Sequence, residues 1–435
     1  MEERSIEIEL QPEKETKSKH GMWTGVVVPC IQNMIGITLF VRMPWIVGQA
    51  GIGMTLLMLA ICILTSLIST LSMSAVVTNG KLSTGGCYYI LARSLGASIG
   101  GSVGMLLFFG QASSASLYII GSVEIFIVST GDEMISKAAD IRVLGIILTV
   151  LLWLLNVGFN KYIKKITLFS IIMLILALLT VYIGIFTAGV RDLPKGIPGL
   201  SSTRFSDNFD PDYDNGNRFH ELITIFYPAV IGFFAGTSKS KELANAHRAV
   251  PRGTLMSILI ASGVYLTVIM MVGAVATRSE LKDNLAILFT LSWPTSFLTT
   301  AFVVIVSSGA GLQCMSSASE VLYSIALDDI IPLSWCKSEL RSLHATAILI
   351  SCLVLVGSLN DIAPIITMFY LLFDASINFA CALLSLLNNP SWRPSWPYFH
   401  WTIAIFGSIL CIVIMLYISW WAALISYLLA AFLYL

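Results

Sequence analysis

The chain has 435 residues, of which 56% are hydrophobic and only 11% are charged, whereas soluble domains carry roughly a quarter charged residues. So few charges cannot cover a water-exposed surface, and the composition therefore excludes an array of soluble domains. The 25 basic and 25 acidic residues leave no net charge, so nothing in the charge balance indicates a nucleic-acid partner.

Apolar runs that are long enough to cross a bilayer recur along the whole chain, and those at 166–188 and 254–276 contain no charge. The sequence therefore predicts an all-α, polytopic membrane protein with about 12 spans. The spans are expected at 23–47, 51–76, 98–127, 143–159, 163–188, 219–236, 252–276, 295–322, 343–358, 362–388, 400–417 and 420–435. The final uncharged stretch is too long for one span, and we expect a pair of short helices that turn near Ser419.

The distribution of basic residues predicts the orientation. With the N-terminus inside, 16 of the 25 lysines and arginines lie in cytosolic segments, as the positive-inside rule requires. Both ends are then cytosolic, residues 1–20 form a disordered cytosolic tail, and residues 189–218 form the longest outer loop, with an acidic second half.

Two of the predicted spans contain residues that interrupt a helix. The first span contains Pro29–Gly36, with two side-chain amides, and the sixth contains Tyr227–Gly236, with one proline and two glycines. Interrupted helices leave backbone groups free at mid-membrane, which is tolerated where they line a cavity. Paired interruptions at matching positions predict an inverted-repeat transporter, although proline and glycine are also common in membrane helices generally.

This interpretation divides the chain into two inverted five-helix repeats, at 21–188 and 219–388, followed by a helical hairpin at 389–435.

Several short motifs resemble those of the cation–chloride cotransporters, most closely the potassium–chloride branch. They are Pro29-Cys-Ile-Gln-Asn33, Leu39-Phe-Val-Arg42, Ser72-Met-Ser-Ala-Val-Val-Thr-Asn-Gly80, Gly85-Gly-Cys-Tyr-Tyr89, Leu117-Tyr-Ile-Ile-Gly121 with Glu124, Gly309-Ala-Gly-Leu-Gln313 and Trp392-Arg-Pro394. The resemblance extends from Gly21 to the end of the sequence, which stops at the last predicted span without that family's large C-terminal cytosolic domain.

The resemblance implies the leucine-transporter-like fold of the amino acid–polyamine–organocation transporters. It also implies sodium-independent, electroneutral symport of potassium with chloride by alternating access, in the plasma membrane rather than an internal one. The expected partners are membrane lipid and the two transported ions, with no cofactor, no other metal and no enzymatic chemistry.

The resemblance places a potassium ion between the first, third and sixth spans. Its implied ligands are the backbone carbonyls of Asn33, Met34 and Pro228 and the hydroxyl of Tyr118. Neutral oxygens suit a large, weakly hydrated cation. Ile231 stands where the family usually has a threonine ligand, so one cation ligand is missing.

For chloride, the resemblance implies two sites made of backbone amides. The upper site would use Gly36, Ile37 and Thr38, at the start of a half-helix whose free N–H groups attract an anion. The lower site would use three consecutive residues of the sixth span, namely Gly232, Phe233 and Phe234.

Two further pairs take roles from the resemblance. Gly309 and Ala310 stand where sodium-using members of the family have two serines, so the sodium site is expected to be lost. Arg42 and Glu124 are implied to pair as an outer gate, because lone charges inside a membrane are costly. The alternative is that both side chains extend separately to the membrane surface.

Asp374 replaces the tyrosine that caps the lower chloride site in the family. Three roles are open for it: a protonated donor, an ionised substitute for the lower chloride, which we favour slightly, or a proton carrier. A fourth reading is that Asp374 merely faces a watery vestibule.

Two other functions remain open. A transporter of amino acids or amines with the same fold would bind a carboxylate at the span-one amides and an ammonium at Asp374. A membrane subunit without transport activity would act through its surface. A homodimer through spans 11 and 12 is a further expectation.

Overall fold

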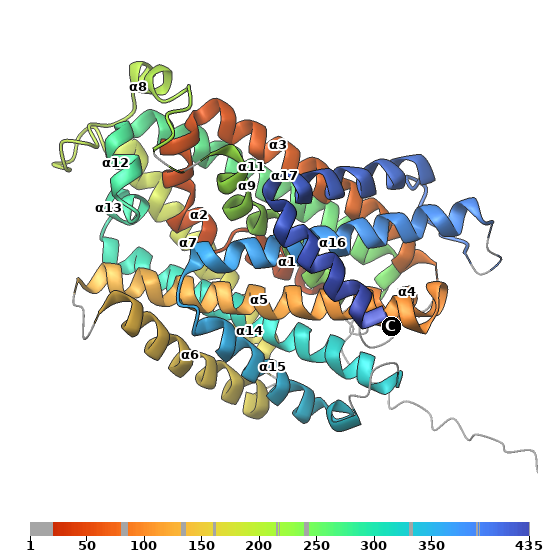
Figure 1. The fold of residues 1–435 in the computed structure, drawn as a ribbon. Helices are drawn as coiled ribbons and strands as arrows, with labels where there is room; N and C mark the ends of the chain where they lie inside the picture. The colour runs from red at the N-terminus through yellow and green to blue at the C-terminus, as the bar shows by residue number, and fades with distance from the viewer. Residues whose placement is uncertain are drawn as a thin grey trace, which may run out of the picture.

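The computed structural model describes residues 21–79, 86–131, 136–159, 162–214, 216, 218–238, 243–329, 334–388, 390 and 392–434. The expected N-terminal tail, residues 1–20, lies outside this part of the chain. The prediction of an all-α fold is confirmed, since every regular element is helical in the described residues. The long helices run side by side, with α8 and α12 at one end of the bundle and α4 at the other (Figure 1).

The elements follow in chain order. They are η1 (Trp23–Val27), α1 (Val28–Met34), α2 (Ile37–Val41), α3 (Met43–Thr78), α4 (Cys87–Leu95), α5 (Ala97–Thr130), α6 (Lys137–Phe159), α7 (Ile163–Thr187), α8 (Ser202–Asp207), α9 (Phe219–Phe226), η3 (Tyr227–Phe234), α10 (Ala235–Ser238), α11 (Ala246–Val275), α12 (Arg278–Asp283), α13 (Ile287–Leu291), α14 (Ser296–Leu327), η5 (Ser334–Cys336), α15 (Glu339–Val354), α16 (Leu359–Leu386) and α17 (Trp401–Tyr434).

Ten helices in the described residues are long and apolar enough to cross a membrane, against about 12 predicted spans. Two features account for the difference. The ninth predicted span is α15, which has only 16 residues. The last two predicted spans run together as α17, but Ser419 within it has a non-helical backbone (φ −161°, ψ 104°). The turn predicted near Ser419 is therefore present.

The first predicted span is more divided than its sequence indicated. It comprises η1, α1, α2 and the beginning of α3. The second span starts after Gly51, which has a φ of +70°. A Cβ at Gly51 would lie 2.4 Å from the carbonyl oxygen of Asp210, so only glycine fits where the outer loop crosses this bend.

Hydrogen bonds hold the outer loop to this bend. The amides of Ile52 and Gly53 donate to the carbonyls of Asn208 and Phe209. The Asn208 side chain also donates to two carbonyls at the end of α11, at 2.7 and 2.9 Å. The loop therefore joins the outer ends of α3 and α11.

Candidate ion-binding site

The helix of span one is interrupted at Ile35 and Gly36. Ile35 has φ −90° and ψ 67°, and Gly36 is extended, with φ −107° and ψ −155°. The interruption separates α1 from α2, as the proline and glycine in this stretch predicted. A Cβ on Gly36 would lie 2.6 Å from the ring of Tyr118, so the break packs directly against α5.

Span six changes its helix type rather than unwinding. Its outer part is α9, and the eight residues of η3 then form a 3₁₀-helix up to α10. A run of this length is uncommon, because the 3₁₀ hydrogen-bond geometry is poorer than that of an α-helix. The prediction of an irregular segment here is confirmed, but the backbone stays helical instead of extended.

The two irregular segments touch at Gly232. A Cβ there would lie 2.6 Å from the amide nitrogen of Met34 and 2.7 Å from the carbonyl carbon of Asn33. No residue with a side chain fits at this contact without moving one of the two segments. The glycine of η3 therefore sets the close approach of spans one and six.

A cavity of about 20 Å³ lies beside this contact. This volume holds about one water-sized particle, which is close to the size of a dehydrated potassium ion. Its wall comes from α1, α5, η3, α10, α14 and α16 and is made by Asn33, Gln111, Ser114, Tyr118, Pro228, Ile231, Gly232, Phe234, Ala235, Cys314 and Tyr370. Three of the four predicted potassium ligands, Asn33, Tyr118 and Pro228, are among them, and so is Ile231.

Tyrosine hydroxyls hold the carbonyls at the end of α1. The hydroxyl of Tyr118, on α5, donates to the carbonyl of Asn33. The hydroxyl of Tyr265, on α11, donates to the carbonyl of Met34 at 2.9 Å. Each carbonyl oxygen keeps a second lone pair. The structure thus brings Asn33 and Tyr118 together, whereas Met34 faces Tyr265 and does not line the cavity. Sequence reasoning missed Tyr265, because nothing local marks it.

The residues predicted for the upper chloride are not part of the cavity wall, although Gly36 packs against the ring of Tyr118. Gly36, Ile37 and Thr38 precede the first helical hydrogen bond of α2, so their N–H groups have no partner within that helix. Thr38 is buried, and Ile37 packs against Gly121 of α5.

The residues predicted for the lower chloride divide in a different way. Gly232 and Phe234 line the cavity, and the carbonyl of Phe233 accepts a hydrogen bond from the thiol of Cys30 at 3.4 Å. Asp374 is fully buried but lies outside the cavity wall. Its carboxyl accepts a hydrogen bond from the hydroxyl of Tyr227 at 3.2 Å.

Gly309 and Ala310 are buried in α14, and Gly309 lies beside the hydroxyl of Ser170 and the side-chain amide of Gln32. A Cβ on Gly309 would lie 2.7 Å from Gln32 Nε2. That nitrogen donates to the carbonyl of Val306 at 3.3 Å, and Gln313 Nε2 donates to Gln32 Oε1 at 2.7 Å. The side chain of Gln32 therefore fills the space beside Gly309. The sequence marked Gln32 only as an amide in the broken span.

Arg42 and Glu124 form the ion pair that the resemblance implied. Arg42 Nη2 lies 3.0 and 2.9 Å from the two carboxylate oxygens, and the two side chains are only 5% and 9% exposed. Arg42 Nε also donates to Asn360 Oδ1 at 2.8 Å, which ties the pair to the beginning of α16. Sequence reasoning did not find Asn360.

At the opposite end of the bundle, Asp328 joins α4 to the end of α14. The hydroxyl of Tyr88 donates to its carboxylate at 2.9 Å, and Arg93 lies 3.7 Å from it. The Arg93 side chain is 66% exposed, so this ion pair is far more open to solvent than the pair of Arg42. Polar contacts therefore bridge helices at both ends of the bundle.

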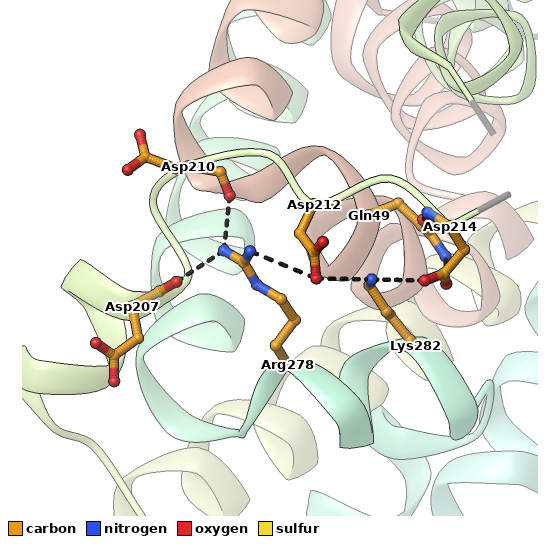
Figure 2. Close-up of polar contacts among 7 residues, drawn as sticks. All are labelled: Gln49, Asp207, Asp210, Asp212, Asp214, Arg278 and Lys282. Carbon is orange, nitrogen blue, oxygen red and sulfur yellow. Dashed lines mark hydrogen bonds and ion pairs between the residues drawn. The ribbon is translucent and has the colours of Figure 1, made fainter.

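Figure 2 shows the contacts that fasten the outer loop, which we call the outer clasp: Gln49, Asp207, Asp210, Asp212, Asp214, Arg278 and Lys282. The guanidinium of Arg278 donates to the carbonyls of Asp207 and Asp210, at 2.7 and 2.6 Å. The ammonium of Lys282 lies between the carboxylates of Asp212 and Asp214, at 3.0 and 2.8 Å.

These contacts shift the pKa values of two groups in the outer clasp. Hydrogen bonds from Lys282, and secondarily from Gln49, lower the pKa of Asp214. For Lys282, partial burial lowers the pKa, but the hydrogen bonds to Asp214 and Asp212 outweigh it and raise the pKa overall.

Residues 25–435 match the model of the amino acid permease family. The chain belongs to this family. The match covers both broken spans and the whole cavity wall, so it agrees with the multi-pass, all-helical fold described above.

The chain is also similar to cation–chloride cotransporters over nearly its whole length. Cation-chloride cotransporter 1 of Oryza sativa subsp. japonica is 36% identical over 99% of this chain and 48% of that protein. Solute carrier family 12 member 2 of Mus musculus is 32% identical over 96% of this chain and 38% of that protein. Potassium/chloride cotransporter 3 of Caenorhabditis elegans is 28% identical over 93% of this chain and 50% of that protein.

The chain thus spans about half the length, or less, of the curated relatives that it matches. The identities support the resemblance to cation–chloride cotransporters, but they do not favour the potassium–chloride branch over the others.

Proposed function

We propose that this protein is a secondary active transporter that moves potassium together with chloride, without sodium, by alternating access around the two irregular segments. The observation that carries the proposal is the cavity between α1, α5 and η3. It has room for about one dehydrated ion and is lined by neutral polar groups, among them Asn33, Ser114 and Tyr118. Neutral oxygens are the ligands that potassium takes in selective membrane sites.

The Asn33 carbonyl and the Tyr118 hydroxyl are the first two ligands in this proposal, because the structure already holds them in contact. The carbonyl of Pro228, in the cavity wall, is the third. The carbonyl of Met34 is the fourth, and it would have to turn from Tyr265 towards the cavity to reach the ion. Ile231 contributes only an apolar wall, so the ion has one ligand fewer than a threonine at that position would give. The names of the relatives, cation–chloride cotransporter and potassium/chloride cotransporter, agree with this cargo.

We further propose that chloride binds the amides of Gly36, Ile37 and Thr38. These N–H groups lie at the positive end of α2, and Gly36 packs against the ring of Tyr118, which also lines the cavity. An anion there would therefore lie near the proposed cation site. A second chloride is proposed at Gly232, Phe233 and Phe234, where η3 continues into α10.

The surroundings of Gly309 support sodium independence. Gly309 and Ala310 have no side-chain oxygen, and the adjacent amide of Gln32 presents an N–H donor to the carbonyl of Val306. A sodium ion needs several oxygen acceptors around it, and these two positions supply none from their side chains.

The description of the family model favours amino acids as a second candidate cargo. Two features of the structure weigh against them. The cavity holds about one water-sized particle, which is far smaller than an amino acid. The residue proposed to bind an ammonium, Asp374, lies outside the cavity wall.

Arg42 and Glu124 are proposed as the outer gate. The pair is buried, and with Asn360 it connects the start of α3 to α5 and α16. Ions entering from outside would have to separate these helices.

The test is chloride-dependent rubidium uptake into liposomes that contain the purified chain. Uptake is expected to require chloride and to be unchanged when sodium is replaced by an organic cation. Tyr118→Phe removes one cation ligand and should weaken the apparent affinity for rubidium about 10- to 100-fold, since a hydrogen-bonding group that meets a charge contributes about 1.5–3 kcal/mol. The matched control is Tyr417→Phe, because Tyr417 is exposed on α17.

Other outcomes would refute the proposal. Uptake that needs sodium would contradict the argument from Gly309, and uptake of an amino acid in place of rubidium would favour the second candidate. A chain that transports neither would support a modulatory membrane subunit.

A further inference from the structure

A fully buried carboxyl, Asp374 on α16, lies behind η3 and away from the ion cavity. One of its oxygens accepts a hydrogen bond from the Tyr227 hydroxyl at 3.2 Å, and the Ser69 hydroxyl on α3 lies close to the carboxyl. The other oxygen, Oδ1, has no partner in the described part of the chain. A buried acceptor without a partner is unfavourable by about 1–3 kcal/mol.

Asn378 lies one helical turn after Asp374, so the two side chains share a face of α16. Asn378 Nδ2 donates to Ser69 Oγ at 3.1 Å, which leaves the Ser69 proton free for Asp374. The amide oxygen of Asn378 has no partner either, nor does the hydroxyl of Thr70, next to Ser69 on α3. All of these residues are fully buried.

The groups that face this cluster carry no positive charge. The titratable side chains that interact electrostatically with Asp374 are Tyr227 of η3, Tyr370 of α16 and Cys411 of α17, and all three are neutral at physiological pH. From α3 the neighbours are hydroxyls. Among the described residues, no lysine, arginine or histidine forms an ion pair with Asp374. An ionised Asp374 would therefore be a buried charge without a counter-ion.

We propose that Asp374 and Asn378 form a proton-binding site behind span six. A proton on Asp374 Oδ1 neutralises the carboxyl and turns an unpartnered acceptor into a donor. The amide oxygen of Asn378, one turn further along the same helix face, is also unsatisfied, so one proton shared between them would satisfy two orphaned atoms. A metal cation would need a shell of several oxygens, and two unpartnered acceptors with one hydroxyl are too few.

The proposed site is connected to the ion cavity through two residues. Tyr227, which donates to Asp374, immediately precedes Pro228 in the cavity wall. Tyr370, one turn before Asp374, lines the cavity and lies 3.4 Å from the hydroxyl of Ser114. Loss of the proton would place a negative charge behind both tyrosines and would favour entry of water between η3, α3 and α17. Proton occupancy therefore biases the position of span six.

The experiment uses the whole chain, purified in detergent and also reconstituted in liposomes. Wild-type protein is compared with Asp374→Asn and with the control Asp361→Asn, since Asp361 is an exposed carboxylate in the first turn of the same helix. The first readout is thermal stability as a function of pH, which does not require transport.

Wild type and Asp361→Asn should lose stability as the pH rises, because ionisation leaves an uncompensated buried charge. Asp374→Asn keeps a neutral side chain at every pH and should show no such loss. In liposomes with equal pH on both sides, chloride-dependent rubidium uptake by wild type should fall by up to about tenfold per pH unit beyond the midpoint, as expected for one proton. Asp374→Asn should abolish that fall.

If Asp374→Asn does not fold, a second variant still tests the proposal. Asn378→Leu removes the acceptor of the proposed proton and should move the loss of stability to lower pH by about one unit, the equivalent of one hydrogen bond. An unchanged midpoint in this variant would overturn the proposal.

Three further results separate the possibilities. Identical pH profiles for wild type and Asp374→Asn would refute the proton site. Stabilisation of wild type by sodium or lithium at fixed pH, lost in Asp374→Asn, would replace the proton with a metal cation and would also refute it. The uptake readout rests on the proposed function, whereas the stability readout does not. If the wild-type chain transports no rubidium, the proposed function is refuted. If its stability nevertheless depends on pH and this dependence disappears in Asp374→Asn, the proton site is supported.

Discussion

Replacing Gly232 with alanine would separate the two irregular segments of spans one and six. The added Cβ would meet the backbone of Met34 at 2.6 Å and of Asn33 at 2.7 Å, where ordinary contacts are 3.4–4 Å. Because both obstacles are backbone atoms, one segment must shift by roughly 1 Å, and overpacking of this kind is unfavourable by about 1–3 kcal/mol. The shift also moves the Asn33 carbonyl relative to Tyr118, and with it the proposed cation site.

Two measurements check this prediction: the thermal stability of the purified chain and its chloride-dependent rubidium uptake. Gly232→Ala should lower the first and strongly reduce the second. The matched control is Gly263→Ala on α11, where a Cβ meets nothing within 4 Å. That substitution should be neutral or stabilising, by up to about 1 kcal/mol of helix propensity. If both variants behaved alike, the contact between the two segments would not be as close as the structure shows.

Three further predictions follow from the ion pairs. Arg42→Met leaves Glu124 buried without its partner and should destabilise the chain by about 3–5 kcal/mol. The double variant with Glu124→Leu should recover most of that loss in a thermal melt, and a double variant as unstable as the single one would contradict the pairing. Lys282→Met should change the global free energy of unfolding by no more than about 1 kcal/mol, because the ion pairs it removes are exposed. The substitution should nevertheless speed proteolysis of the outer loop. High salt should speed the same proteolysis in wild type, because it screens these ion pairs. The pKa of Asp214 is lowered in the folded chain, so the ionised Asp214 stabilises the attachment of the loop. This stabilisation is complete above the unfolded pKa near 3.8 and is lost as the pH falls below that value. Proteolysis of the loop should therefore accelerate only in acid.

The parts of the fold that follow from local chemistry were predictable from the sequence. The break before α2 and the turn at Ser419 come from residues that interrupt a helix where they stand, and both are present. The ion pair of Arg42 and Glu124 was predictable through the resemblance, and its burial fits the cost of leaving either charge alone in a membrane.

The direction of individual side chains was not predictable. Successive residues of a helix point about 100° apart. Phe373 packs on the ring of Phe234, which is part of the cavity wall, whereas the adjacent Asp374 hydrogen-bonds Tyr227. The role of Asp374 at the lower anion site stays a prediction, and the structure adds only that its side chain does not line the cavity.

The same reasoning explains why partners distant in sequence were missed. Tyr265 holds the carbonyl of Met34, and Asn360 holds Arg42, across 231 and 318 residues of sequence. Both are ordinary polar residues in their own helices, so only the packing of those helices gives them a role at the site.

The two polar closures differ in a way that suits alternating access. At the outer end, the Arg42–Glu124 pair is withdrawn from water, so its strong mutual attraction is offset by the desolvation of both charges. If this end opened, the two charges would lose their mutual attraction but regain their hydration. The free-energy difference between the open and closed states would therefore be small. At the opposite end, the Arg93–Asp328 pair stays largely solvated and contributes little in either state. If the chain works as proposed, neither closure would lock it, and ions or a proton bound beside span six would decide which end opens.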